Sequence, residues 1–256
     1  MTTRNWRAKN TRAGCGTMYF DCYIPSTPAL SIFTDVGAST WVAPTKVTSV
    51  EYLVVGGGGG GGGAYNTGSA GGGGAGLVLT GTLTVTPGTT YTITVGDGGV
   101  GGLKNISGTA GTLSTFHTIT AAGGGGCRES RDQTGSSGLG GDVASDPLAA
   151  TGGSGAGSSE GGEDGGGGGG NTTAGGSTTT TAGVSKEGGS GLASTITGTS
   201  VTYGAGGDGG IVNTSSNGDD GAANTGNGGD GATSVSFDEK TGGKGGSGIV
   251  ILKYLI

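Results

Sequence analysis

The pattern of apolar and polar residues predicts β-strands that border glycine. In residues 47–55 the apolar Val50, Tyr52 and Val54 recur at every second position, which places them on one face of a strand. Residues 248–254 contain four consecutive aliphatic residues, Ile249–Leu252, which is typical of a buried strand. Both segments adjoin glycine, so we expect strands that pass directly into glycine-rich chain.

A hairpin is predicted in the next part of the sequence. Residues 82–86 and 90–95 alternate threonine with leucine, valine, tyrosine and isoleucine, and Pro87–Gly88 between them has the residues of a tight turn. Threonine on one face and apolar residues on the other suit a half-buried antiparallel sheet. A further strand is expected at about 113–119.

Glycine is the most frequent residue, with 69 of 256 positions, while apolar residues make up only 30% of the chain. Little α-helix is expected, because each glycine costs a helix about 1 kcal/mol relative to alanine. The glycines stand in blocks such as Gly56–Gly63 and not at every third position, which excludes collagen. Strands resume after the blocks and charged residues make up only 12%, so we favour an ordered fold over a disordered low-complexity chain.

An ordered glycine block needs partners for its backbone groups, since ordering glycine is costly in entropy. The polyproline II helix offers a solution, because its N–H and C=O groups point outward and can bond to neighbouring helices. At about 3.1 Å per residue, the eight glycines of 56–63 would span about 25 Å. We therefore expect a bundle of polyglycine helices, with flexible linkers as the alternative.

Composition divides the chain into two parts. Residues 1–40 have ordinary composition and are predicted to be an attachment segment, whereas residues 41–256 form a glycine-rich domain whose insert spans about 123–232. The attachment segment holds many of the aromatic residues. Its candidates for docking on another subunit are Trp6, Tyr19, Phe20, Tyr23 and Phe33.

Charge and cysteine content limit the possible partners. The net charge of −6 argues against nucleic acid, which requires a basic face. The basic residues among the first twelve fit docking on an acidic neighbour, or solvation, better than nucleic-acid binding. No apolar run approaches the roughly 20 residues of a membrane span, and no apolar signal core is present, so we expect synthesis in a cytoplasm without membrane insertion. The odd number of cysteines, Cys15, Cys22 and Cys127, suggests thiols in a reducing compartment.

Residues for catalysis are scarce. His117 is the single histidine, and no phosphate-binding loop lysine occurs. Neighbouring carboxylates such as Asp219 and Asp220 are expected to be turn residues and not a glycosidase pair. We predict no catalytic residues, no metal site and no cofactor, while calcium at the Asp-Gly steps of Asp97, Asp208 and Asp230 is left open.

Several strand-to-glycine junctions resemble a glycine-rich module of bacteriophage tail-fibre, adhesin and related virion fibre proteins, over about residues 41–256. The resemblance rests on Trp41–Pro44, on Tyr52–Val55 passing into Gly56–Gly63, on Val85–Gly88, on Tyr91–Gly96 with Gly98 and Gly99, and on Gly245–Ile251 with Tyr254. It implies an all-β fold, with an antiparallel β-sandwich or jelly-roll-like framework that carries a polyglycine helix bundle of the polyproline II type. Related fibre tips bind bacterial surfaces through loops at the end of such a bundle.

We therefore expect a non-enzymatic virion protein made in the host cytoplasm, either a tail-fibre or tail-tip adhesin or a purely structural part such as a head fibre, decoration or spike protein. Its expected partners are other virion proteins, further copies of itself, for example in a trimer, and a bacterial surface saccharide or outer-membrane protein. Candidate receptor contacts are aromatic, amide and basic residues in glycine-flanked turns: Tyr65, Asn66, Arg128, Arg131, Tyr203 and Asn213.

Overall fold

A computed structural model describes residues 27–66, 68–104, 106–127, 168–173, 175, 187–211 and 213–256. These residues form an all-β fold, as expected, and no helix occurs among them. Accordingly, the described part of the chain offers no helix with the length and apolar character needed to cross a bilayer.

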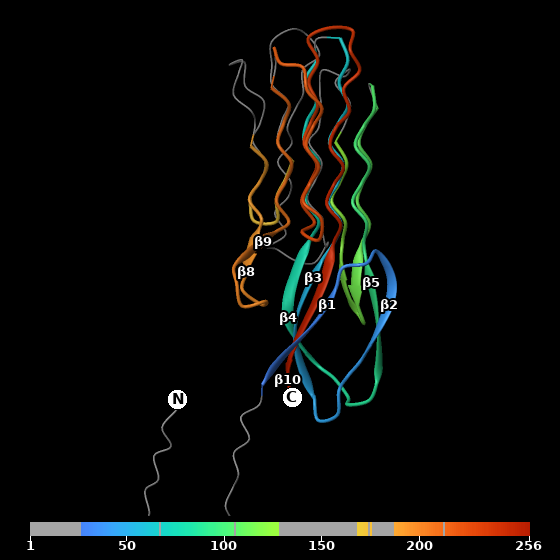
Figure 1. The fold of residues 1–256 in the computed structure, drawn as a ribbon, viewed down its shortest axis with the longest axis vertical. Coiled ribbons are helices and arrows are strands. Elements are labelled where there is room, and N and C mark those ends of the chain that lie inside the picture. Colours follow the sequence, from blue (N-terminus) through green and yellow to red (C-terminus); the bar gives the residue numbers. More distant parts are fainter. Residues whose placement is uncertain are drawn as a thin grey trace, which may run out of the picture.

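Two four-stranded antiparallel sheets form a sandwich (Figure 1). Sheet 1 has the order β1 (Pro28–Phe33), β10 (Ile249–Leu255), β3 (Ser49–Val55), β4 (Val78–Thr84). Sheet 2 has the order β2 (Gly37–Val42), β5 (Thr90–Val95), β6 (Ser114–Phe116), β7 (Ile119–Ala121). A separate hairpin pairs β8 (Leu192–Ser194) with β9 (Val201–Tyr203).

Strand β3 is buried on both faces, which explains its continuous apolar end. Val50 and Val54 face the space between the sheets, where the rings of Trp41 and Phe116 meet edge to face at 6.2 Å. Alternate residues of β3 point the other way and join a second apolar cluster beneath the β8–β9 hairpin. That second cluster consists of Leu53, Val55, Val78, Ile196, Tyr203, Ile249 and Ile251.

The predicted hairpin of residues 82–86 and 90–95 does not form. Strand β4 ends at Thr84 and pairs with β3, whereas β5 pairs with β2 and β6, so Pro87–Gly88 carries the chain from one sheet to the other. Alternation specifies which face of a strand is buried, not which strand lies beside it. The strand expected at 113–119 is also divided, because His117 has φ of +55° in a turn between β6 and β7.

The boundary predicted at residue 40 falls inside β2. Strand β1 precedes residue 40 and strand β2 contains it. Strand β1 pairs with β10 and β2 pairs with β5, so both strands belong to the two sheets. Phe33, a predicted docking residue, is half-buried and packs against the core between the sheets. Residues 28–40 are therefore part of the sandwich.

Glycine-rich runs leave one end of the sandwich and lie side by side as a bundle (Figure 1). The run 56–63 lies at its centre and donates successive backbone N–H groups to three antiparallel neighbours in turn, at N···O distances of 2.8–3.3 Å. This three-residue repeat is that of the polyproline II helix. The bonds are Gly56, Gly59 and Gly62 to Leu77, Gly74 and Gly71; Gly57, Gly60 and Gly63 to Thr112, Thr109 and Ile106; and Gly58, Gly61 and Ala64 to Gly246, Gly243 and Lys240.

Three further runs, at 99–102, 124–127 and 229–232, donate to the carbonyl groups of the same central run. A side chain has no room there: a Cβ built on Gly59 would lie on the carbonyl oxygen of Gly125, and one on Gly61 on that of Asp230. The bundle is thus a solid body whose interior is backbone, as the glycine blocks predicted.

Glycine helices come from more of the chain than the predicted insert of 123–232. The runs 56–63, 71–76, 96–112 and 241–248 also belong to the bundle, since they bond to one another and to the central run. We call the far end of the bundle, with loops 64–70, 103–106, 211–216 and 233–240, the tip. The opposite end of the sandwich, where Thr27 bonds to Ile256, is the base (Figure 1).

Candidate functional site

Two aromatic residues meet at the tip although they are far apart in sequence. Tyr65 follows the central glycine run, and Phe237 lies in loop 233–240. Backbone bonds align these segments, with the Asn66 N–H donating to the Ser236 carbonyl at 3.1 Å. The two rings pack edge to face with centroids 5.9 Å apart, yet Phe237 remains 74% exposed. An exposed ring held in a fixed position is suited to contact with a partner.

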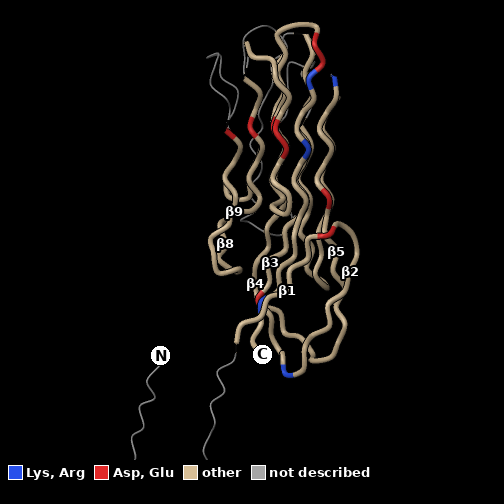
Figure 2. The backbone as a smooth tube through the Cα atoms, in the orientation of Figure 1, with Lys and Arg blue, Asp and Glu red and all other residues tan. Residues whose placement is uncertain are grey.

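Lys104 connects a third loop to this pair. Its Nζ lies 3.9 Å from the centre of the Tyr65 ring and 3.0 Å from Glu239 Oε1. The hydrogen bond to Glu239, with a smaller contribution from Tyr65, raises the pKa of Lys104. Figure 2 shows basic and acidic residues together at this end of the bundle. One ammonium group therefore joins loops 64–70, 103–106 and 233–240.

Aliphatic side chains extend the exposed surface around this cluster. Leu103 and Ile106 flank Lys104 in its loop, and Val235 precedes Phe237; about half of each side chain is exposed. Large exposed apolar residues gathered at one end of a protein are typical of a site of interaction. We call Tyr65, Leu103, Lys104, Ile106, Val235, Phe237 and Glu239 the tip cluster.

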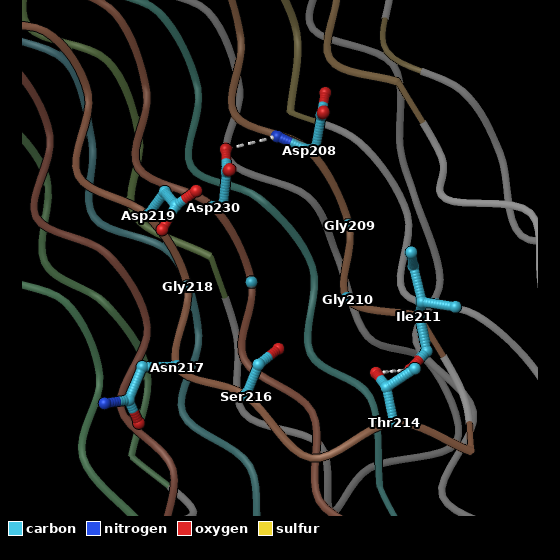
Figure 3. A pocket seen from close by; sticks show the side chains of 11 residues that line it. Asp208, Gly209, Gly210, Ile211, Thr214, Ser216, Asn217, Gly218, Asp219 and Asp230 are labelled. Atoms are coloured by element: carbon cyan, nitrogen blue, oxygen red, sulfur yellow. Dashed lines mark hydrogen bonds between the residues drawn. The ribbon is translucent and has the colours of Figure 1, made fainter.

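A second polar feature lies on the side of the bundle. A pocket of about 230 Å³ is lined by carboxylates from three adjacent runs, Asp208, Asp219 and Asp230 (Figure 3). Asp230 Oδ1 accepts a bond from the Asp208 N–H at 2.8 Å, and Asp208 Oδ1 accepts one from the Gly188 N–H at 2.7 Å. The carboxylates of Asp230 and Asp208 thus supply acceptors that a further glycine run would provide inside the bundle.

Burial raises the pKa of Asp230 to about 6, and the charges of Asp208 and Asp219 act in the same direction. The bond from the Asp208 backbone opposes this rise. In the part of the chain that the structure describes, no group of three or more His, Cys, Asp or Glu side chains is arranged to hold a metal ion. Asp97 accepts bonds from the Gly98 N–H at 2.8 Å and from Lys244 Nζ at 3.0 Å.

The structure places some of the predicted contact residues together. Tyr65 and Asn66 lie at the tip, and Asn213, with φ of +63°, lies in loop 211–216 at the same end. Tyr203 does not belong with them: it is the last residue of β9 and only 4% exposed, and burial raises its pKa. The expectation that Tyr203 contacts a receptor is corrected, because its ring fills the cluster on the outer face of sheet 1. Arg128, Arg131, Trp6, Tyr19, Phe20 and Tyr23 lie outside the described residues.

The sequence reasoning missed Lys104, Phe237 and Glu239. A signal was available, since Val235–Lys240 interrupts the glycine-rich chain with apolar, aromatic and charged residues in succession. Such a break between two glycine runs marks the place where the chain must turn, and where side chains have room.

Comparison with protein families assigns most of the chain to a described domain. The model of a family described as a glycine-rich domain matches residues 34–255, which includes every strand except β1 and all of the bundle. No curated protein matches the chain.

Proposed function

The chain belongs to this glycine-rich domain family, and we propose that it is a bacteriophage virion protein, a tail-fibre or tail-tip adhesin that binds the host cell surface through its tip. The observation that carries the proposal is Phe237, a 74% exposed ring supported by Tyr65 and Lys104 at the end farthest from the base. Exposed aromatic residues supply large contact areas at low entropic cost.

The bundle supports this role mechanically. Its runs are joined by backbone hydrogen bonds at every turn, so the tip loops start from fixed positions. A surface that is already ordered before contact loses less entropy on binding. The proposed act is passive recognition of a bacterial surface saccharide or outer-membrane protein, with no chemical step.

Attachment to the particle is assigned to the base. Residues 1–26 enter the described fold at Thr27, beside the C-terminal Ile256 and at the opposite end from the tip. A contact there with other virion proteins would leave the tip exposed to the host. Several copies on one particle would add avidity.

The proposal is tested with the labelled full chain on a panel of bacterial strains. We expect saturable binding to susceptible cells and protection of those cells from infection. Phe237→Ser should reduce binding at least tenfold, which corresponds to about 1.4 kcal/mol. The matched control is Val36→Ser, since Val36 is 52% exposed and lies in the turn between β1 and β2, away from the tip. Absence of binding to every strain would instead favour a purely structural virion part.

A further inference from the structure

Four dipeptides among the described residues, each an asparagine or aspartate followed by glycine, share one bonding arrangement in the bundle. The side-chain Oδ1 accepts from the backbone N–H of one residue in a neighbouring run, and the glycine N–H donates to the carbonyl of that same residue. We call this two-bond arrangement a clamp; its N···O distances are 2.6–3.0 Å. The four clamps are Asn217–Gly218 on Thr241, Asp220–Gly221 on Lys244, Asn227–Gly228 on Ala205 and Asp230–Gly231 on Asp208.

The clamps follow the three-residue repeat of the runs that carry them. Two lie in residues 217–221 and two in residues 227–231, three residues apart in each case, and their partners in 241–244 and 205–208 have the same spacing. Each clamp satisfies both backbone groups of its partner residue. Asparagine and aspartate can both do this, because each presents an oxygen at the same distance from the backbone.

The two residue types differ in chemical stability, since asparagine before glycine is labile. The glycine nitrogen attacks the asparagine Cγ: a bond forms between nitrogen and Cγ, and the side-chain amide leaves as ammonia with the proton of the glycine N–H. Water then opens the five-membered imide at either carbonyl and gives aspartate or isoaspartate. Glycine favours this reaction because its backbone is the least hindered. The sequence has two Asn-Gly dipeptides, 217–218 and 227–228, and both form clamps.

A clamp opposes both requirements of ring closure. The reacting nitrogen must lose its proton and approach the amide carbon in the right orientation. Instead, the Gly218 N–H donates to the Thr241 carbonyl at 2.9 Å, and the Gly228 N–H donates to the Ala205 carbonyl at 2.8 Å. The amide must also turn toward that nitrogen, but its oxygen is held by the N–H of the same partner residue, at 3.0 Å and 2.9 Å respectively. Ring closure therefore requires both bonds of the clamp to break.

We propose that Asn217 and Asn227 are deamidation sites that the folded bundle keeps closed and that react when their runs separate from the neighbouring runs. Isoaspartate continues the backbone through Cγ and so adds one carbon to the run, which displaces the later N–H groups from their partners. Deamidation of the unfolded chain thus makes unfolding irreversible. The proposal is independent of what the tip binds.

Peptide mass spectrometry of the full chain, held at mildly alkaline pH in buffer or in urea, tests the protection. We expect both asparagines to lose their amide at least tenfold more slowly in the folded chain than in the denatured chain. Synthetic peptides of residues 214–221 and 224–231, measured in both solutions, correct for the effect of urea on the reaction itself. Equal corrected rates in the folded and the denatured chain would overturn the proposal.

Thr241→Pro tests the clamp at one site. Proline has no N–H for the Asn217 oxygen, while its φ is that of a polyproline II run. Amide loss at Asn217 should rise severalfold in the folded variant, and Asn227 should stay protected. The matched control is Lys244→Pro, the same change one turn further along the run at the Asp220 clamp, which should leave both asparagines protected. An unchanged rate at Asn217, or an equal rise at both asparagines, would contradict the proposal.

Refolding gives a second readout that needs no change in the partner runs. The chain is held unfolded with a thiol reductant for increasing times and returned to buffer, and the fraction that refolds should fall in step with its isoaspartate content. A variant with both Asn217→Asp and Asn227→Asp keeps the clamp oxygens, as Asp220 and Asp230 do, but has no amide to lose. Its recovery should decline severalfold more slowly. The same decline in both chains would show that deamidation does not cause the loss, against the proposal.

Discussion

Asp230 accepts a hydrogen bond from the backbone N–H of Asp208 at 2.8 Å, with the carboxylates of Asp208 and Asp219 beside it. Its oxygen completes the outer side of the bundle, but its charge is unfavourable there. The pKa of about 6 expresses that conflict, which burial causes first and the two neighbouring carboxylates increase.

Asp230→Asn should therefore stabilise the protein. The folded state holds the Asp230 proton more tightly than the unfolded state, in which the pKa is near 3.8, so the cost of the charge begins as the pH rises through about 3.8 and is complete above about pH 6. The amide oxygen keeps the bond from the Asp208 N–H. We expect a gain of about 1–2 kcal/mol at pH 7.5, after allowance for solvent screening, and only a small part of it at pH 4. Urea unfolding at both pH values measures it.

The matched control for Asp230 is Asp220→Asn. Asp220 also accepts a backbone bond, from the Lys244 N–H at 2.6 Å, but its side chain is exposed. Its substitution should change stability by less than about 0.5 kcal/mol at either pH. A similar gain from both variants would mean that reduced net charge, and not the Asp230 environment, is responsible.

Gly59→Ala tests the backbone interior of the bundle. The added methyl group would lie on the carbonyl oxygen of Gly125, and neither run can move without breaking several backbone bonds. We expect a loss of about 3 kcal/mol or more, seen as a lower thermal midpoint. Gly81→Ala is the comparison, because the new methyl group would meet only the side chain of Tyr52, which can rotate aside. Equal losses at the two sites would contradict a close-packed glycine core.

Asn227→Ala should weaken the outer run 204–210. The Asn227 Oδ1 accepts a bond from the Ala205 N–H at 2.9 Å. The same bond recurs three residues later in both runs, where Asp230 Oδ1 accepts from the Asp208 N–H. Removal of the acceptor leaves a half-buried N–H without a partner, at a cost of about 1 kcal/mol. Hydrogen exchange should accelerate at Ala205, while exchange at Gly59, inside the bundle, stays unchanged. Uniform acceleration at both amides would indicate global destabilisation instead.

Lys104→Met separates order at the tip from stability of the fold. The Lys104 pair with Glu239 is exposed, so its loss should change the free energy of unfolding by less than about 1 kcal/mol. The three tip loops, however, lose their common contact, and hydrogen exchange in residues 234–240 should rise severalfold. Binding to cells should fall with it. Lys253→Met, which removes a similar ion pair with Glu51 on sheet 1, should leave tip exchange and binding unchanged.

Glycine blocks between strands contain enough information to predict the bundle, because few structures other than packed polyproline II helices can order eight glycines. The same sequence does not specify strand pairing. The alternation in residues 82–86 and 90–95 fits a hairpin as well as it fits two strands in different sheets. The two strands join different sheets because β4 pairs with β3 and β5 pairs with β2.

The tip shows where local reasoning fails. Tyr203 directly precedes a glycine and Tyr65 lies two residues after one, yet Tyr203 is buried against sheet 1 and Tyr65 packs against the exposed Phe237. Their difference arises from contacts between segments more than a hundred residues apart, which no local pattern encodes. Lys104 gains its role in the same way, from a partner 135 positions later.

The three-residue bonding repeat also sets how this body can change in length. Deletion of one residue from a run would direct its backbone N–H groups toward the wrong neighbouring runs. Deletion of three residues would return each N–H group to the same neighbouring run, one turn lower. Matched removal of one triplet from each run would shorten the bundle by about 9 Å, at about 3.1 Å per residue, and leave its cross-section intact. The distance between the sandwich and the tip loops can therefore change in steps of one helical turn, without any change in the sandwich or in the loops themselves.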